Sequence, residues 1–576
     1  MKKLTSILFA MLLSTLSCWA YDFMVDGICY QFYSKDKSAV EVTYSSTNSY
    51  TNVAHYKGDI VIPEQVTYSG KTYTVKSIYG STFYGCTGIT TIKIPNTVIE
   101  IGQTAFKDCT GLISLSIPDA VAALPPALCK GCKSLKEVYI GKSVAKIGKE
   151  SFTGCTSLST LSFNAENCEG VVYYEVQWFA DCPLAKIVIG DDVKSVPAYL
   201  AEEKTTLTSL TIGKNVKSIG SWAFSGSTSL SSLTLPNSVT SIKAGAFKGC
   251  SGITSLIIPD SVETIESNAF SNCFGLTSLT LGRALTSLRY STFKGCTSLA
   301  SLTYNAEDCA EWSSDINAWF DDCPLNSVVI GPSVKTIPGR FIRGQKNVTS
   351  VVIPNSVTSI GNSAFYQCNS LASLSIGNSV ASIGRYAFSE CYALTSLTLP
   401  KSLKTIGEYA FSRSSGFSTV VIPDSVTAID GSAFYDCNGL SSVTLGSSVS
   451  FLGQYAFCGC DVLSSFYAKQ KEPLSIDPNV FMNSPVDSAT LYVPVGSKSK
   501  YAAADEWKYF GTIKEMDFST KGDVNGNGQV DVSDVTSLIN KILGLATYDD
   551  TACDVNANGQ VDVSDVTALI NLILGH

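Results

Sequence analysis

The chain has 576 residues, 16% of them charged, and a net charge of −8. Only two histidines occur, His55 and His576, which excludes most histidine metal sites and any Ser-His-Asp or Cys-His catalysis in a repeated structure. Residues 517–576 hold nine Asp, no Glu and two Lys, so the rest of the chain is close to neutral. This balance argues against a nucleic acid partner and gives the acidic tail a role of its own.

The first 20 residues have the pattern of a secretory signal peptide. A positively charged start precedes the mainly apolar run Leu4–Leu16, and small residues follow it. The run is too short to span a bilayer, and no later segment offers about 18 uninterrupted apolar residues. We therefore expect an exported chain without a transmembrane segment, beginning near Tyr21. Lipidation of Cys18 is the alternative.

Residues 21–80 contain alternating extended runs such as Val40–Tyr44 and Thr72–Ile78. They predict a β-rich N-terminal cap. A stack of repeats needs such a cap, because its first coil would otherwise expose apolar core.

Residues 81–490 repeat the pattern L-x-x-L-x-L-(P/G)-x-S-V-x-x-I-G-x-x-A-F-x-x-C about every 23 residues. The leucines alternate, which places them on the inner face of a short strand while Ser and Thr face outward. Pro or Gly ends this strand, and S-V-x-x-I forms a second extended piece. One coil cannot bury its apolar side alone, so coils must stack. The pattern predicts a leucine-rich-repeat solenoid of about 18 short β coils, of the α/β repeat type.

An apolar anchor near the end of each repeat sets the number of coils. Leu128 and Leu200, or a neighbour of each, fill the two gaps in the phenylalanine series. The predicted phenylalanine anchors are Phe83, Phe106, Phe152, Phe179, Phe224, Phe247, Phe270, Phe293, Phe320, Phe341, Phe365, Phe388, Phe411, Phe434, Phe457 and Phe481.

Twelve of the 20 cysteines lie three residues after a phenylalanine anchor. Export favours disulfides, but a stacked column gives each thiol equivalent neighbours and no unique mate. Ser227 and Ser414 also replace Cys without a matching second change. We therefore expect buried free thiols that act as small hydrophobic side chains. The pair Cys129 and Cys132 has redox or zinc spacing, but without His or a second pair we expect a structural role.

A larger duplication overlies the repeats, since residues 152–224 recur at 293–365 with an offset of 141. In each copy one coil is lengthened to 27 residues, so an extra loop must leave the stack. Partner binding and plain structural insertion are both open for these loops. We expect Trp178 and Trp319 to pack over the core. The loops carry Tyr173, Tyr174 and Trp312.

Residues 466–516 abandon the repeat and end in a C-terminal cap over 491–516. The run Ala489–Pro494 predicts a strand, and a short helix is expected around Ser499–Glu506.

Residues 517–576 carry two copies of a loop followed by an apolar helix pattern, 31 residues apart. Each loop has oxygen-bearing residues at positions 1, 3, 5, 7, 9 and 12 and glycine at position 6, as calcium loops do. Position 12 is Asp, which reaches less far than the usual Glu. We predict two calcium ions, with the glutamines contributing backbone carbonyls. The predicted ligands are Asp523, Asn525, Asn527, Gln529, Asp531, Asp534, Asp554, Asn556, Asn558, Gln560, Asp562 and Asp565.

The two Asp-ended loops, each followed by one helix, resemble a type I dockerin over residues 521–576. The resemblance implies calcium-dependent folding and binding to a cohesin module on a scaffold or cell-surface protein. It also implies that loop positions 10 and 11 help to select the cohesin. These are Val532 and Ser533 in one half and Val563 and Ser564 in the other. The two pairs are identical, so either half could dock.

The repeat register resembles the BspA-like leucine-rich-repeat proteins of bacteria over about residues 58–490. This resemblance implies surface exposure and adhesion to host matrix proteins or other bacteria, without identifying the ligand. We predict a secreted, surface- or scaffold-associated binding protein that is not an enzyme. The alternatives are a carbohydrate-active enzyme carried by the dockerin, which would need paired carboxylates in a cleft, and a passive structural spacer.

Overall fold

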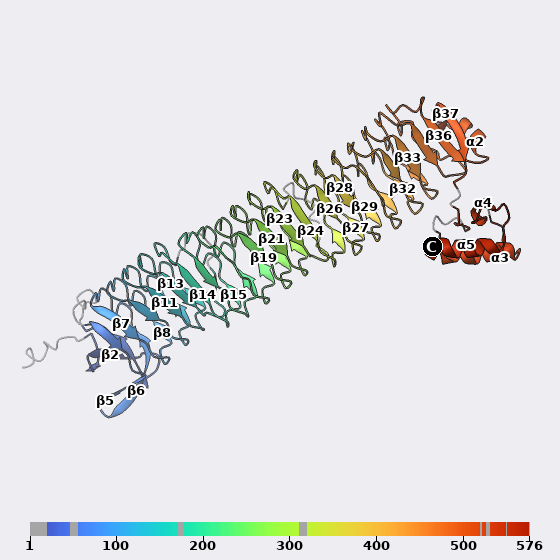
Figure 1. Ribbon diagram of the computed structural model, residues 1–576. Helices are drawn as coiled ribbons and strands as arrows, with labels where there is room; N and C mark the ends of the chain where they lie inside the picture. Colours follow the sequence, from blue (N-terminus) through green and yellow to red (C-terminus); the bar gives the residue numbers. More distant parts are fainter. Residues whose placement is uncertain are drawn as a thin grey trace, which may run out of the picture. The chain divides into compact units, whose positions relative to one another are not determined.

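The computed structural model describes residues 20–45, 56–170, 178–309, 319–518, 521–525, 530–548 and 550–574 (Figure 1). The predicted signal peptide before residue 20, both histidines and the two inserted loops lie outside these ranges. The chain is a β-solenoid of about 18 turns followed by a helical region. It divides into two compact units, Met1–Pro324 and Leu325–His576.

The first unit begins with a β-rich segment at the first coils, as the alternating runs predict. Its strands pair in the order β1-β2-β3-β6-β5, and β6 also pairs in parallel with β8 of the first coils. That last pairing joins this segment to the stack, so the first coil is not left open. The strands are β1 (Phe23–Val25), β2 (Ile28–Phe32), β3 (Ala39–Thr43), β5 (Gln65–Tyr68) and β6 (Lys71–Ile78).

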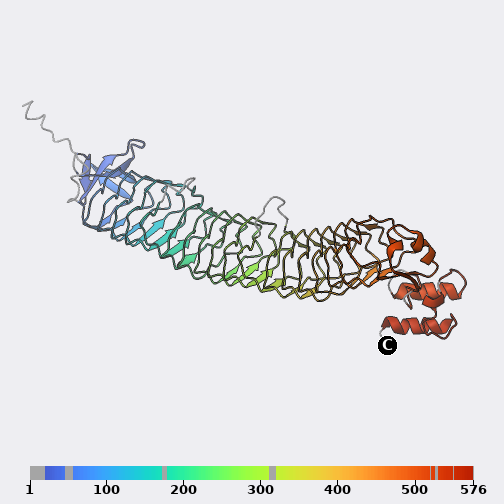
Figure 2. The same cartoon turned by 90° about the horizontal axis from the view of Figure 1, so that it is seen from above.

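The coils of the first unit stack so that equivalent segments form parallel ladders along two faces (Figure 2). The first face is built from β4 (Gly58–Val61), β7 (Ile89–Lys93), β9 (Ser114–Ser116), β11 (Glu137–Ile140), β13 (Thr160–Phe163), β14 (Lys186–Ile189), β16 (Ser209–Thr211), β19 (Ser255–Ile257), β21 (Ser278–Leu281) and β23 (Ser301–Tyr304). The second face is built from β8 (Glu100–Ile101), β10 (Ala123–Leu124), β12 (Lys146–Ile147), β15 (Ser195–Val196), β17 (Ser218–Ile219), β18 (Ser241–Ile242), β20 (Thr264–Ile265) and β22 (Ser287–Leu288).

The second unit repeats this arrangement. Its first face contains β24 (Ser327–Ile330), β26 (Ser350–Val352), β28 (Ser373–Ser375), β31 (Thr419–Val421), β33 (Ser442–Leu445), β35 (Ser465–Ala468), β36 (Thr490–Pro494) and β37 (Thr512–Met516). Its second face contains β25 (Thr336–Ile337), β27 (Ser359–Ile360), β29 (Ser382–Ile383), β30 (Thr405–Ile406), β32 (Ala428–Ile429) and β34 (Phe451–Leu452).

The strands alternate between core and surface as the leucine pattern predicts. In β21, Leu279 and Leu281 are buried while Ser278 and Thr280 face outward. The ladders are in register, so Ser278 lies opposite the serines of the neighbouring coils. Each outward column is therefore a row of Ser and Thr hydroxyls with interspersed Val and Ile, as expected for an extended binding surface.

The third side of each coil is a tight turn, and no helix occurs in the described residues of the repeats; the expectation of an α/β repeat is wrong in this respect. In these turns the residue two positions before the anchor and the residue two positions after it have positive φ. Around Phe270 they are Asn268 (59°) and Asn272 (58°). A left-handed residue interrupts the succession of right-handed residues that a helix requires. The turn therefore cannot propagate into a helix.

Glycine at these left-handed positions relieves backbone strain. Gly344 has φ of 77°, and a Cβ added there would meet nothing within 4 Å. Replacing Gly344 with alanine should therefore lower the free energy of unfolding by about 1–2 kcal/mol through φ alone. Exposed Glu203 also has positive φ (58°), so Glu203→Gly should raise the free energy of unfolding. Denaturant melts of both variants check the pair, and equal effects of one sign would contradict this explanation.

One anchor differs from the predicted ones, since Ile342 takes the place expected for Phe341, and at the two gaps the anchors are the neighbours of Leu128 and Leu200. An anchor residue donates its backbone N–H to a carbonyl oxygen of the next coil, as Phe247 does to Ala269. In three coils the residue that makes this bond is Cys129, Ala201 or Ile342. The bulkier Leu128, Leu200 and Phe341 instead occupy the preceding position, which is alanine in most other coils. Both positions are buried, so the larger side chain can stand at either one while the core stays filled. The other phenylalanines form rows such as Phe247, Phe270 and Phe293, with centroids 5.4 and 5.5 Å apart.

The thiols are free and buried, as expected, and they also donate hydrogen bonds. Cys250 Sγ lies 3.2 Å from the carbonyl oxygen of Phe224, the anchor of the preceding coil, and most other ladder cysteines repeat this contact. Ser414 makes the equivalent bond at 2.7 Å. Lys204 takes the same place in its coil and donates from Nζ to Phe179 O at 2.7 Å. The column therefore satisfies anchor carbonyls as well as filling space.

Burial should make these thiols inert in the folded protein. It raises the pKa of Cys250, Cys368 and Cys460 to about 12 each, so almost no thiolate exists near pH 8. We expect iodoacetamide at pH 8 to label these thiols only after unfolding, and then without a reductant. Intact-mass counting of labels checks this. Labelling that requires a reductant would show disulfides instead.

Trp178 and Trp319 are buried against the core, as expected. The last coil is closed by an aromatic plug rather than by another coil. Trp507 is buried and makes edge contacts with Phe466 and Phe481. The elements of this region are β36, α2 (Lys498–Ala503), η2 (Trp507–Tyr509) and β37, so the helix starts one residue before the predicted one and ends three earlier.

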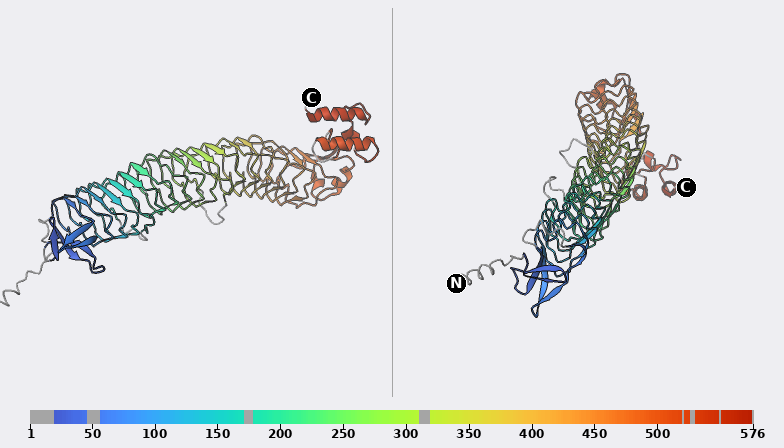
Figure 3. Two further views of the ribbon diagram at one scale, coloured as in Figure 1. Left: turned by 90° about the horizontal axis from the view of Figure 1, so that it is seen from below. Right: turned by 90° about the vertical axis from the view of Figure 1, so that its left-hand side faces the viewer.

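The C-terminal region is all helical, as predicted. Two helices, α3 (Val532–Ile542) and α5 (Val563–Leu574), run side by side, with the short α4 (Asp550–Cys553) near them (Figure 3). Their common core contains Val524, Leu538, Cys553, Val555 and Leu569. No helix in the described part of the chain is both long and apolar enough to cross a membrane.

Candidate calcium and docking site

The second acidic loop, between α4 and α5, is folded around Asp554, its first position. One carboxylate oxygen of Asp554 accepts the N–H of Asn558 at 2.9 Å, and the other accepts that of Gly559 at 2.9 Å. Gly559 has φ of 84°, which glycine adopts without strain. The loop backbone therefore turns back on this carboxylate.

The last position of each loop ties the loop to the helix that follows it. Asp565 accepts the N–H of Asn556 at 3.0 Å with one oxygen and the N–H of Asp562 at 2.9 Å with the other. Asp534 makes the same two bonds, to Asn525 at 3.0 Å and Asp531 at 2.9 Å. Asp531 is the N-cap of α3 and Asp534 its third residue, a capping box. Loop position 9 is thus the N-cap of α3, and loop position 12 is the residue that completes its capping box.

These terminal carboxylates are buried. Asp534 and Asp565 are both 0% exposed, and no Lys, Arg or His of the described residues forms an ion pair with either. Hydrogen bonds from the Ser564 hydroxyl and N–H also lower the pKa of nearby Asp562. A buried negative charge is costly unless a cation compensates it. A bound cation would therefore stabilise the folded loops electrostatically.

The residues fit calcium by their chemistry. The second loop offers carboxylates of Asp554, Asp562 and Asp565, amide oxygens of Asn556 and Asn558, and the Gln560 backbone, which is the oxygen set that Ca²⁺ takes. Among the described residues, no three His, Cys, Asp or Glu side chains are gathered closely enough to hold a metal. The acids hold backbone N–H groups instead. In the first loop, Asp523, Asn525, Asp531 and Asp534 are described, whereas Asn527 and Gln529 lie outside the described residues.

The predicted partner-binding residues differ in orientation. Val532 and Val563 begin α3 and α5 and are 72% and 70% exposed. Ser533 and Ser564 instead turn to their loops, where each hydroxyl donates to the aspartate two residues earlier. The valines are thus available to a partner, and the serines serve the loop.

Each helix also exposes an apolar stripe, which is part of the apolar helix pattern that follows each loop in the sequence. Ile539 and Leu543 continue from Val532 along α3, and Ile570 and Leu574 continue from Val563 along α5. The steps of seven and eleven residues place each set on one helix face. These residues recur at the same 31-residue spacing as the loops, and this repetition is the sequence signal that could identify them.

The sequence profile of the BspA type leucine rich repeat region matches residues 76–204, 194–316, 314–440 and 381–503. The chain belongs to the BspA-type leucine-rich-repeat family. The profile of the dockerin type I domain matches residues 521–574. A dockerin implies a cohesin as partner, and type I dockerins bind calcium. The BspA-type chain thus combines protein-binding repeats with a docking module, and neither brings a catalytic domain.

Several solved structures share features with the BspA-type chain. A leucine-rich repeat protein from Bacteroides ovatus is 24% identical, with 78% of this chain and 94% of that chain covered and a TM-score of 0.36. A leucine rich cell surface protein from Faecalibacterium prausnitzii is 22% identical, with 77% and 94% covered and a TM-score of 0.26. The pneumococcal vaccine antigen PcpA is 15% identical, with 86% and 98% covered and a TM-score of 0.29. No curated protein sequence matches the chain.

Proposed function

We propose that this protein is an extracellular adhesion protein held on a cohesin-bearing scaffold or surface protein by its calcium-loaded dockerin. The observation that carries the proposal is the pair of buried carboxylates, Asp534 and Asp565, which no cation among the described residues compensates. Two calcium ions, one per loop, would supply that charge and use the twelve predicted ligands. The docking surface would then be Val532 and Val563 with the apolar stripes behind them.

The solenoid supplies the second part of the proposal. Its outward columns of Ser and Thr are long and regular, which suits many modest contacts with an extended partner. The pair Cys129 and Cys132 is buried and Cys132 donates to Phe106 O at 3.0 Å, which supports a structural role for these thiols. Host matrix proteins and other bacterial surfaces are the proposed targets of this face.

A pull-down with the whole chain and with a truncation ending at Met516 tests both parts. Each bait is exposed to surface proteins of the producing organism and to matrix proteins, with calcium or with EDTA. A partner lost with EDTA and with truncation supports dockerin anchoring. A partner retained by the truncation supports recognition by the repeats. Docking that survives EDTA would overturn calcium-dependent anchoring by the dockerin. A truncation that captures no partner would overturn recognition by the repeats.

A further inference from the structure

Several first-face strands end at a proline. Where other residues stand at this position, the N–H can bond the preceding coil: Gly190 donates to Phe163 O at 2.8 Å and Asn305 to Leu281 O at 3.1 Å. Proline has no N–H to donate. The strands that run into Pro259, Pro354 and Pro423 pair only with the coil that follows them, whereas those that run into Pro95 and Pro118 pair with both neighbouring coils.

One coil of the second unit is flanked by two such prolines. Neither Pro400 at its end nor Pro423 in the next coil can donate an N–H to the coil before it. Residues 396–399 belong to no ladder in the described chain, and none of their N–H groups makes a hydrogen bond there. Such unpaired backbone groups are available to a ligand.

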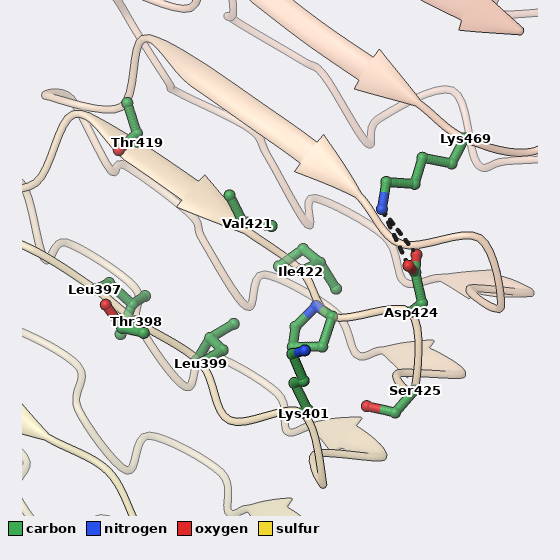
Figure 4. A pocket seen from close by; sticks show the side chains of 11 residues that line it. Leu397, Thr398, Leu399, Lys401, Thr419, Val421, Ile422, Asp424, Ser425 and Lys469 are labelled. Atoms are coloured by element: carbon green, nitrogen blue, oxygen red, sulfur yellow. Dashed lines mark hydrogen bonds and ion pairs between the residues drawn. The ribbon is translucent and has the colours of Figure 1, made fainter. Parts of the chain in front are cut away.

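A hollow of about 550 Å³ lies between this isolated segment and β31 (Figure 4). Its lining is mixed: Leu397, Leu399, Val421 and Ile422 are apolar, and hydroxyl-bearing residues stand between them, namely Thr398, Thr419 and Ser425. The volume is within the range of small-molecule sites in proteins.

Three charged side chains line one end of the hollow. Lys469 is directed at Asp424, with its Nζ 3.2 and 3.0 Å from the two carboxylate oxygens (Figure 4). Burial alone would raise the pKa of Asp424, but the Ser447 N–H and Lys469 outweigh it and the pKa is lowered. Lys401 is exposed and forms no ion pair with the described residues, but its charge reaches Asp531 at the N-cap of α3, whose pKa it helps to lower. At this end of the hollow two lysines face one aspartate, so positive charge is in excess among the lining residues.

We propose that this hollow binds a small amphipathic carboxylate, with its apolar body against Leu397, Leu399 and Val421 and its carboxylate at Lys401. The unpaired N–H groups of 396–399 add donors that a carboxylate or a polar substituent can use. A cationic amphiphile would meet the wrong charge, and a purely polar anion would leave the wall uncovered.

The chain contains a matched control. Residues 233–236 repeat the sequence Leu-Thr-Leu-Pro of 397–400, also lie outside every ladder, and are followed one coil later by Pro259. With the constant offset of 164, Asp260 matches Asp424, but Asn237 and Asn305 stand where Lys401 and Lys469 are. The first interruption thus has the apolar wall without the lysines.

The test is calorimetric titration of the full-length protein with decanoate, and with decyltrimethylammonium as the cationic comparison. Decanoate should bind and the cation should not. Lys401→Asn, which reproduces Asn237, should weaken decanoate binding about tenfold, the loss of one charge-assisted contact. Lys401 is exposed, so this variant should keep the wild-type melting curve.

A second variant removes the hollow rather than the charge. Pro423→Gly restores the N–H and allows close approach, as at Gly446, where an added Cβ would lie 2.3 Å from the Pro423 oxygen. It should abolish decanoate binding, whereas Pro259→Gly should leave it unchanged. No decanoate binding by the wild type, equal binding of the cation, or binding indifferent to both Lys401→Asn and Pro423→Gly would each overturn the proposal.

Discussion

The double variant Asp523→Ala with Asp554→Ala is expected to abolish calcium-dependent docking while the solenoid stays folded. Both residues occupy loop position 1, and the Asp554 carboxylate holds the N–H groups of Asn558 and Gly559. Their loss removes a ligand and a loop-forming contact together. Calcium at 1,000 times its Kd stabilises a binding domain by about 4 kcal/mol, so a small domain that loses its ions should unfold. Cohesin capture and calcium titration by calorimetry measure the effect.

A second pair of variants separates the ion from the loop. Asp534→Asn with Asp565→Asn keeps one of the two side-chain oxygens that accept backbone N–H groups, replaces the other with an amide NH2 and removes both buried charges. In EDTA this variant should be more stable than wild type, because the uncompensated charges are gone; in calcium it should be less stable. Unchanged docking in the alanine variant, or no crossover between EDTA and calcium in the asparagine variant, would contradict the calcium assignment.

The alternation of leucines sufficed to predict the strands, because period-2 burial is a local property of the chain. The anchor at Phe341 was misplaced, and those near Leu128 and Leu200 could not be assigned to one residue, for a physical reason. Side-chain bulk suggested the register, whereas the backbone register follows the left-handed residues two before and two after each anchor, such as Tyr199 and Glu203. The larger side chain can stand at either of two adjacent buried positions, so bulk alone does not define the register.

In the C-terminal region, too, some features could be predicted from the sequence and others could not. The oxygen residues and their spacing predicted the loops, because each ligand position is set by local sequence. The opposite orientations of Val532 and Ser533 depend on the N-cap of α3, where Asp531 accepts the Ser533 hydroxyl. The thiol hydrogen bonds were equally inaccessible, since they depend on which way the carbonyl of a neighbouring coil points. The thiol bonds join segments more than 20 residues apart, so no local sequence pattern contains them.

Replacing Trp507 with alanine is expected to lower the free energy of unfolding of the last coils by about 3–5 kcal/mol, the usual cost of truncating a buried aromatic side chain. Trp507 is 1% exposed, and its Nε1 donates to Leu474 O at 2.8 Å. Trp507→Phe keeps a ring and should cost less, and Tyr509→Ala, at an exposed neighbour, should cost little.

The effect of Trp507→Ala should be local, because each coil contacts only its neighbours. Hydrogen exchange should therefore accelerate over β35, β36 and β37 and remain at wild-type rates in coils nearer the N-terminus. Uniform acceleration along the stack would mean that the coils unfold as one cooperative body. The aromatic plug would then stabilise the whole array rather than its end. In a nearest-neighbour stack, the end coil lacks one of its two interfaces, so the contacts of Trp507 with Phe466 and Phe481 replace an interface that interior coils obtain from the next repeat.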